Sequence, residues 1–103
     1  IDIDLMVHKA ITELMKIDRE NDSNYTETLF IYVNSQQNLA KAAEKMDLHY
    51  NTLKYRINRI VALTGIDLSD KDTVFSLMVS EKILKMKELM ASSDLNYLEL
   101  ANM

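Results

Sequence analysis

Eight residues between positions 49 and 59 place cationic and hydrogen-bonding side chains along about three helical turns: His49, Tyr50, Asn51, Thr52, Lys54, Tyr55, Arg56 and Arg59. At 100° per residue, Asn51, Tyr55 and Asn58 point away from the apolar Leu53. Asparagine can bond adenine through two atoms, lysine can reach guanine acceptors or phosphate, and tyrosine hydroxyls can bond phosphate. This outward strip therefore indicates a helix that binds double-stranded DNA.

The expected contacts differ along this helix. Base edges are expected to be read by three residues near its start, Tyr50, Asn51 and Lys54. Phosphate contacts, which position a helix without reading sequence, are expected from Thr52, Tyr55, Arg56 and Arg59. His49 precedes the helix and could touch a phosphate or cap the helix. Each residue taken singly also fits an ordinary solvated surface, so their clustering after a tight turn carries the prediction.

The segment 38–65 has the pattern of a helix-turn-helix, in which one helix holds a second in the major groove. Asn38 is a good N-cap for a helix over Leu39–Lys45. Small Ala42 and Ala43 allow close helix contact, and larger apolar residues form the wedge behind: Met46, Leu48, Leu53 and Ile57. Asp47 falls at the turn, where aspartate tolerates a left-handed conformation better than most residues.

The composition fits one all-α domain over residues 1–103, an orthogonal bundle of five or six helices with a Fis-like core. The chain has no proline and one glycine, so it lacks the punctuation that hairpins need. The net charge is −4, yet five basic residues face only two acidic ones between Leu39 and Leu63. Positive charge is thus concentrated in the predicted helix-turn-helix.

Several classes of protein are disfavoured. The absence of cysteine excludes disulfides and thiolate metal sites and fits a cytoplasmic location. No apolar run is long enough for a membrane span. Neither His8 nor the acidic residues have the spacing of a metal or acid/base site. We therefore expect no catalytic residues, no metal and no cofactor, and no enzyme.

Two helices are expected before the motif, and a long one after it. Ile3, Val7, Ala10, Leu14 and Ile17 form an apolar stripe that predicts a helix over Asp4–Arg19. Asn24 and Glu27 resemble a capping box that starts a helix ending near Val33. Gly65 predicts a Schellman stop for the helix from Tyr50.

A Ser69-x-x-Asp72 signature predicts the start of a long helix to about Met90. This last helix carries two apolar stripes, Val74/Leu77/Met78/Leu84 and Phe75/Val79/Ile83/Met86/Met90. An arc this wide favours packing within the domain, with a dimer seam as the alternative. Residues 92–103 either form a short extra helix or fray.

The runs His49–Ile57 and Leu63–Leu68 together resemble the C-terminal helix-turn-helix domain of PucR/CdaR-type bacterial transcription regulators, and the resemblance extends over about 14–85. It implies the C-terminal part of a longer regulator that acts as a homodimer or larger oligomer on DNA, with a sensory region upstream of these residues. Tyr50 departs from the arginine usual in the family. Lys54 replaces another common arginine and keeps its charge without the planar fork.

Two other functions are compatible with the residues. A helical protein-interaction or dimerisation module would use the wide apolar arc of the last helix, and the basic strip would be incidental. A Fis-like architectural binder would read DNA shape in place of base edges.

Overall fold

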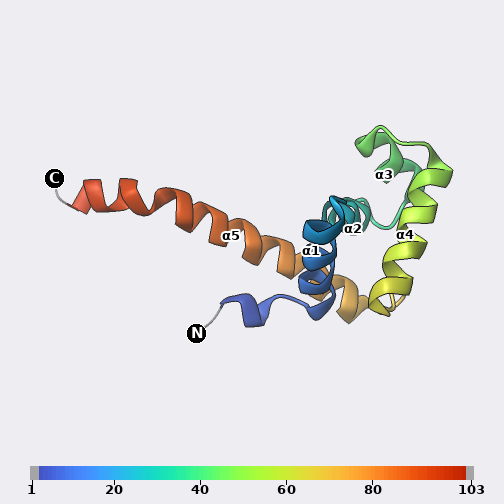
Figure 1. Cartoon of the computed structure of the whole chain (residues 1–103), viewed down its shortest axis with the longest axis horizontal. Helices are drawn as coiled ribbons and strands as arrows, with labels where there is room; N and C mark the ends of the chain where they lie inside the picture. Colours follow the sequence, from blue (N-terminus) through green and yellow to red (C-terminus); the bar gives the residue numbers. More distant parts are fainter. Residues whose placement is uncertain (1–2, 102–103) are drawn as a thin grey trace.

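The computed structural model describes the backbone of residues 3–101 and the side chains of residues 5–92. Within that range it contains a short 3-10 turn and five α-helices (Figure 1): η1 (Ile3–Met6), α1 (Lys9–Asn21), α2 (Tyr25–Asn34), α3 (Leu39–Met46), α4 (Tyr50–Thr64) and α5 (Lys71–Ala101). The described range contains no strand, so the predicted all-α class is confirmed.

α2 lies at the centre of the bundle and contacts the other four helices. The core is built from fully buried side chains that several helices contribute: Leu14, Leu29, Ala42, Leu53, Ile60 and Leu77. Since α3 and α4 both pack on α2, the orientation of the predicted DNA-binding helix is set by the same core that holds α1 and α5.

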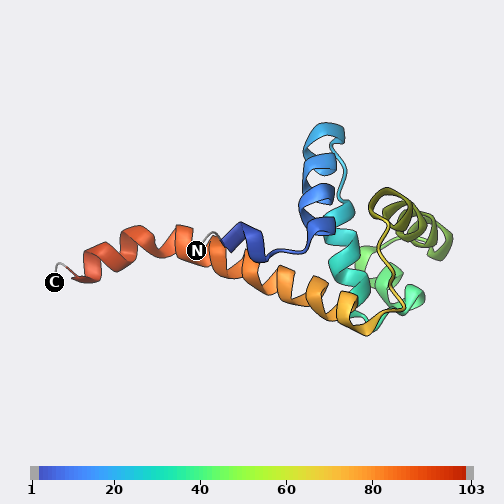
Figure 2. The same ribbon diagram turned by 90° about the horizontal axis from the view of Figure 1, so that it is seen from below.

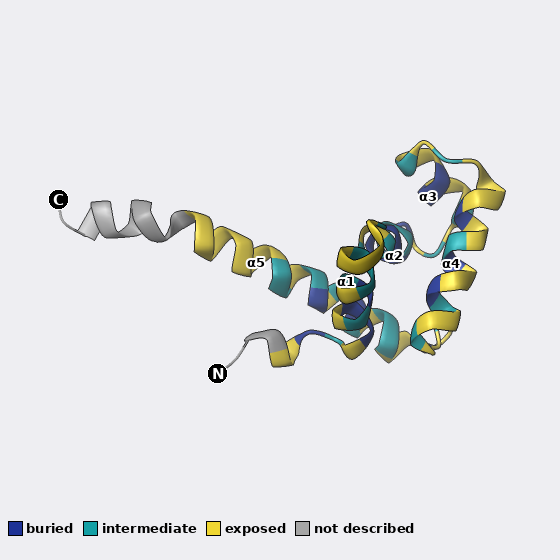
Figure 3. Ribbon diagram, in the orientation of Figure 1, coloured by how far each residue is buried: buried dark blue, intermediate teal, exposed yellow. Residues whose placement is uncertain are grey.

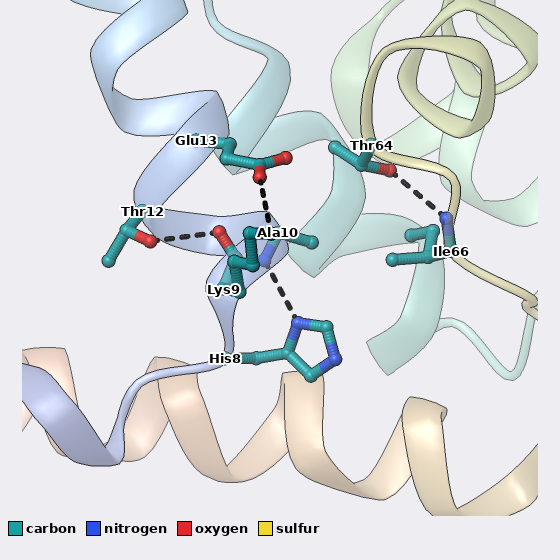
Figure 4. A network of polar contacts seen from close by, with 7 residues as sticks. All are labelled: His8, Lys9, Ala10, Thr12, Glu13, Thr64 and Ile66. Atoms are coloured by element: carbon teal, nitrogen blue, oxygen red, sulfur yellow. Dashed lines mark hydrogen bonds and ion pairs between the residues drawn. The ribbon is translucent and has the colours of Figure 1, made fainter.

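α1 begins later than its apolar stripe predicted. Its N-cap is His8, whose Nδ1 accepts a hydrogen bond from the Ala10 amide at 3.0 Å (Figure 4). The His8 amide donates to Ser80 Oγ of α5 at 2.8 Å. Because α5 takes this amide, the chain turns between η1 and α1 instead of continuing as one helix. Val7 and Leu14 of the stripe are nevertheless buried as expected.

The N-terminus of α2 is capped by Asp18 and not by the predicted capping box. The amides of Tyr25 and Thr26 donate to the Asp18 carboxylate at 2.8 and 3.0 Å. The hydroxyls of Ser23 and Thr26 each donate to it at 2.7 Å, whereas Asn24 makes no side-chain cap. Burial raises the pKa of Asp18, but these hydrogen bonds outweigh that effect and lower it overall.

α4 ends at the predicted glycine, although the stop is simpler than a Schellman motif. Gly65 is left-handed with φ 72°, and its amide donates to Val61 O at 2.8 Å. The Ile66 amide donates to Thr64 Oγ1 at 3.4 Å instead of reaching back to a helix carbonyl (Figure 4). This is the single-bond stop that a left-handed glycine also permits.

The start of α5 was predicted one residue too early. Asp70 caps the helix, because its carboxylate accepts from the Asp72 amide at 3.3 Å and from the Thr73 hydroxyl at 2.8 Å. The Ser69 hydroxyl and amide instead donate to Asp67 Oδ1 and lower the pKa of Asp67.

α5 continues well past the predicted end near Met90. Its 31 residues span about 46 Å at 1.5 Å per residue, and the molecule measures 54 × 28 × 28 Å. The second half of α5 extends away from the bundle, as Figure 2 shows. The extra or frayed element expected over 92–103 is a continuation of this helix through Ala101.

One of the two apolar stripes of α5 packs within the domain, and most of the other does not. Leu77 is fully buried, and Val74, Met78 and Leu84 pack against the core. In the second stripe, Ile83 also packs against the core, but Phe75, Met86 and Met90 are 67%, 59% and 54% exposed. The expectation that the wide arc serves packing within the domain is therefore wrong for most of the second stripe.

Candidate nucleic-acid interface

The predicted helix-turn-helix is formed by α3 and α4. Asn38 Oδ1 accepts from the Lys41 amide at 3.0 Å, which confirms Asn38 as the N-cap of α3. Ala42 and Ala43 are buried at the contact between helices, as are Leu53 and Ile57 of α4. The remaining members of the wedge, Met46 and Leu48, are half-buried.

The turn between α3 and α4 depends on one left-handed residue. Asp47 has φ 54° and ψ 46°, and its amide donates to the carbonyls of Ala43 and Glu44. The next amide, that of Leu48, donates to Ala43 O at 2.9 Å. These bonds satisfy two carbonyls near the end of α3, those of Ala43 and Glu44. The dihedral angles confirm the left-handed conformation predicted for Asp47.

A second left-handed feature precedes α3 and was not predicted. Gln36 and Gln37 have φ values of 57° and 58°. Gln37 Nε2 donates to Leu68 O at 2.7 Å, which ties this loop to the segment before α5. Lys41 Nζ lies 3.4 Å from Gln36 Oε1. No periodic pattern signals such a pair, because a long-range contact supports a local conformation that glutamine disfavours.

The predicted DNA-contacting residues lie on the outer side of α4 and just before it. The following are exposed: His49, Tyr50, Asn51, Thr52, Lys54, Tyr55 and Arg59. The opposite side of α4 buries Leu53, Ile57 and Ile60. α5 packs on α2 and η1 and extends away from α4, so it leaves this outer side open (Figures 1 and 3).

Three of the predicted DNA-contacting residues differ from simple exposed side chains. Arg56 and Tyr50 lie close to residues outside α4, and His49 does not make the helix-cap bond that was one of its two predicted roles. Arg56 is half-buried, and its Nη1 donates to Asn24 Oδ1 at 3.3 Å. Tyr50 is 48% exposed and lies near Tyr32 of α2, whose pKa is raised by burial and further by the Tyr50 phenol. His49 occupies the N-cap position of α4, but its side chain makes no cap bond.

A shallow pocket of about 630 Å³ adjoins this surface. It lies between the α1–α2 turn and α4 and is lined by Asp22, Ser23, Asn24, Tyr25, Thr52, Tyr55 and Arg56. Within this pocket the hydrogen bond from Arg56 to Asn24 connects the outer side of α4 to the residue that precedes α2.

Three exposed residues near the predicted site were not among the expected DNA contacts. Asn58 is exposed on the same strip as Asn51 and Tyr55. The three residues follow one another at steps of four and three, which keeps them on one face of the helix. Lys41 and Lys45 are exposed on α3, the helix that would cross the DNA backbone. The helical projection identifies Asn58, whereas the two lysines follow only from the position of α3 beside α4.

The part of the chain that the structure describes contains neither a candidate metal site nor a helix that could span a membrane. No group of three or more histidine, aspartate or glutamate residues there could hold a metal ion. None of the described helices has the length and apolar content needed to cross a membrane.

Comparison with known proteins identifies the domain. The family model of the PucR C-terminal helix-turn-helix domain matches residues 25–83. The DNA-binding transcriptional activator AdeR of Bacillus subtilis (strain 168) is 31% identical over 77 residues, which cover 75% of this chain and 18% of AdeR. The proline-responsive transcriptional activator PutR of the same organism is 36% identical over 80 residues, which cover 78% of this chain and 20% of PutR.

The chain thus spans about a fifth of the length of these relatives. No solved structure matches it, so the Fis-like likeness stays a prediction. The match to the family model covers more than half of the chain and coincides with α2 to the middle of α5. The chain therefore belongs to the PucR C-terminal helix-turn-helix family, whose members are DNA-binding domains of transcriptional regulators and not enzymes.

Proposed function

We propose that the chain is the sequence-specific DNA-binding domain of a longer PucR/CdaR-type regulator, with the outer side of α4 in the major groove. The observation that supports this most is the division of α4 into two faces. Leu53, Ile57 and Ile60 are buried on one face, while the other exposes amide, phenol and cationic groups to solvent. A major groove about 12 Å wide admits one such helix.

The exposures suggest a division of roles along α4. Asn51 and Lys54 are exposed near the helix start, where a recognition helix meets base edges. Tyr50 is less exposed, at 48%, than Tyr55, at 67%, so its contribution to base reading should be smaller. Thr52, Tyr55 and Arg59 are proposed phosphate contacts. Arg56 can hold Asn24 and still contact phosphate, because a guanidinium has five donors.

The electrostatics make this binding local and sensitive to salt. The whole chain carries a net charge of −4, but basic residues outnumber acidic ones between Leu39 and Leu63. The cations of α3 and α4 are therefore the ones proposed to attract phosphate. Each phosphate contact contributes a slope of about −0.9 to the dependence of log affinity on log salt concentration. Removing Lys54, proposed to reach base edges, together with Arg59, proposed to contact phosphate, removes two positive charges and should weaken binding and flatten that slope.

The test is fluorescence anisotropy of a labelled duplex against salt concentration for a Lys54→Ala/Arg59→Ala variant. We expect affinity to fall by roughly tenfold or more at low salt, and the salt slope to become shallower by about 1 to 2. Lys9→Ala is the matched control, because Lys9 is an exposed cation on α1 whose weak pair with Glu13 spans 3.7 Å. Equal affinity for the double variant and the control would contradict the proposal.

A homodimer on two half-sites about one helical turn apart is part of the proposal. Selection from a random duplex pool tests this arrangement. A palindromic consensus would support two copies that each read base edges. A degenerate consensus rich in A and T would favour the architectural alternative, in which DNA shape is read.

A further inference from the structure

α5 carries an apolar face that the rest of the described chain leaves uncovered. Phe75, Met86 and Leu89 are 67%, 59% and 67% exposed, and Val79 is 37% exposed. Leu77, on the opposite side of the same helix, is fully buried. A row of exposed apolar side chains of this kind usually marks an interaction surface, because isolated domains seldom leave one open to water.

The spacing of the exposed residues is that of a helix-helix seam. Phe75, Val79, Lys82, Met86 and Leu89 are separated by steps of four, three, four and three residues. This alternation keeps one narrow stripe facing a single partner helix in a left-handed coiled coil. We call these five residues the α5 seam. The wider apolar arc suited to a globular core is on the opposite side of α5 and is already occupied.

We propose that the α5 seam pairs with the α5 seam of a second copy of this chain, with the two helices antiparallel. The inference rests on the proposed function to the extent that two half-sites call for two copies. The structure leaves the seam open for such a pair, because the buried Leu77 and Ser80, the latter bonded to the His8 amide, lie on the side of α5 away from the seam. Two copies can therefore bring their seams together while their bundles remain on opposite outer sides.

Lys82 decides the direction of the pairing. It is the one charged residue in the seam and is exposed. A parallel pair would set Lys82 directly against Lys82 of the second copy, which places like charges together. An antiparallel pair sets Lys82 against Val79 or Met86 of the second copy, depending on register. The aliphatic stem then packs on apolar surface while the ammonium reaches water.

The seam is short, which limits the strength of the pair. From Phe75 to Leu89 it spans about 21 Å along the helix, or two heptads. Such a contact is smaller than a standard stable interface. The dimer should therefore depend on protein concentration in the absence of DNA. Binding to adjacent half-sites should strengthen it, since the second contact then becomes intramolecular.

Sedimentation equilibrium of the wild-type chain, Met86→Glu and Ala91→Glu tests the surface. Met86→Glu puts a charge into the seam and should raise the dimer dissociation constant by roughly tenfold or more. Ala91→Glu adds the same charge at an exposed position off the seam, and it should associate like the wild-type chain. A wild-type chain that is monomeric at about 100 µM would overturn the proposal. Equal association of the two variants would do the same.

Cysteine cross-linking tests the direction, because the chain has no cysteine of its own. Phe75→Cys alone should not form a disulfide dimer, since antiparallel helices separate the two copies of this position by about 16 Å or more. A mixture of Lys82→Cys with either Val79→Cys or Met86→Cys should cross-link. A disulfide-linked Phe75→Cys homodimer would overturn the antiparallel arrangement.

DNA measurements separate this inference from the proposed function. Met86→Glu should bind a single half-site as the wild-type chain does and lose the gain in affinity on a duplex with two half-sites. If the wild-type chain dimerises through the seam but binds no duplex, the proposed function fails and the dimer stands. If it binds half-sites and Met86→Glu behaves like Ala91→Glu, the dimer surface is wrong and the proposed function stands.

Discussion

α4 and α5 divide their side chains in different ways. On α4 one face buries Leu53, Ile57 and Ile60 in the core, and the outward face carries polar, phenol and cationic groups. On α5 the core-facing side is apolar as well, but the outward face repeats apolar residues at Phe75, Val79, Met86 and Leu89. A polar outward face is suited to a hydrated, charged partner such as DNA, and an apolar one to another protein surface. One small domain thus presents two separate surfaces with different chemistry.

The strongest way to break this comparison is to truncate a leucine on each helix. Leu53 of α4 is fully buried and Leu89 of α5 is 67% exposed. Leu53→Ala should lower the free energy of unfolding by about 2 to 5 kcal/mol, because it leaves a cavity in the core. Leu89→Ala should change it by less than about 0.5 kcal/mol in the monomer.

Urea unfolding at low protein concentration measures both values, and at high concentration Leu89→Ala should also weaken association. If the two variants lost equal stability at low concentration, then Leu89 would be packed within the domain and the α5 seam would not exist.

A second prediction concerns the cap that holds α2, on which both α4 and α5 pack. Asp18→Asn should destabilise the domain by about 1 to 2 kcal/mol at neutral pH, because an amide has one acceptor where the carboxylate has two. The pKa of Asp18 lies below its usual 3.8 in the folded chain. Its contribution is therefore complete above about pH 4 and disappears as the pH falls through the folded-state pKa.

Urea unfolding between about pH 7 and pH 3 should show the difference between wild type and Asp18→Asn shrinking as the pH falls. The exposed Glu20→Gln is the control for loss of one carboxylate. A difference that grew on acidification would show that Asp18 does not cap α2 in its ionised form.

The smallest effect is expected at the turn between α3 and α4. Asp47→Gly should raise the free energy of unfolding by about 0.5 to 1 kcal/mol, because glycine adopts the left-handed conformation of Asp47 without a steric penalty. The reciprocal change, Gly65→Ala, should destabilise by a similar amount. An added Cβ at Gly65 would meet no atom within 4 Å, so the loss would come from its φ of +72° alone.

Thermal unfolding tests both predictions. The Tm of Asp47→Gly should rise by a few degrees and that of Gly65→Ala should fall by a few degrees. A stabilised Gly65→Ala would mean that the left-handed stop of α4 is not required.

The sequence predicted the helix-turn-helix well because its signals are local. Asn38 caps the helix that directly follows it, and Asp47 and Gly65 adopt the conformations that their positions require. The buried and exposed faces of α4 also follow from periodicity alone. These features depend on residues within one or two helical turns, which a sequence pattern captures.

The errors arose where distant residues competed with local ones. Asp18, not the adjacent Asn24, caps α2, and Ser80 of α5 takes the His8 amide that would otherwise continue α1. The open face of α5 could not be predicted either, because both of its stripes are equally apolar in the sequence. Only the position of α2 and η1 shows which stripe is covered.

The most direct measurement of the central claim is an NMR titration of the labelled chain with a half-site duplex. At protein concentrations where the chain is monomeric, the largest amide shifts should fall on Asn51, Lys54, Tyr55 and Arg59 of α4. The amides of the α5 seam should move little. Large shifts along Phe75 to Leu89 with an unchanged α4 would contradict the account, because DNA would then bind the apolar helix and not the polar one.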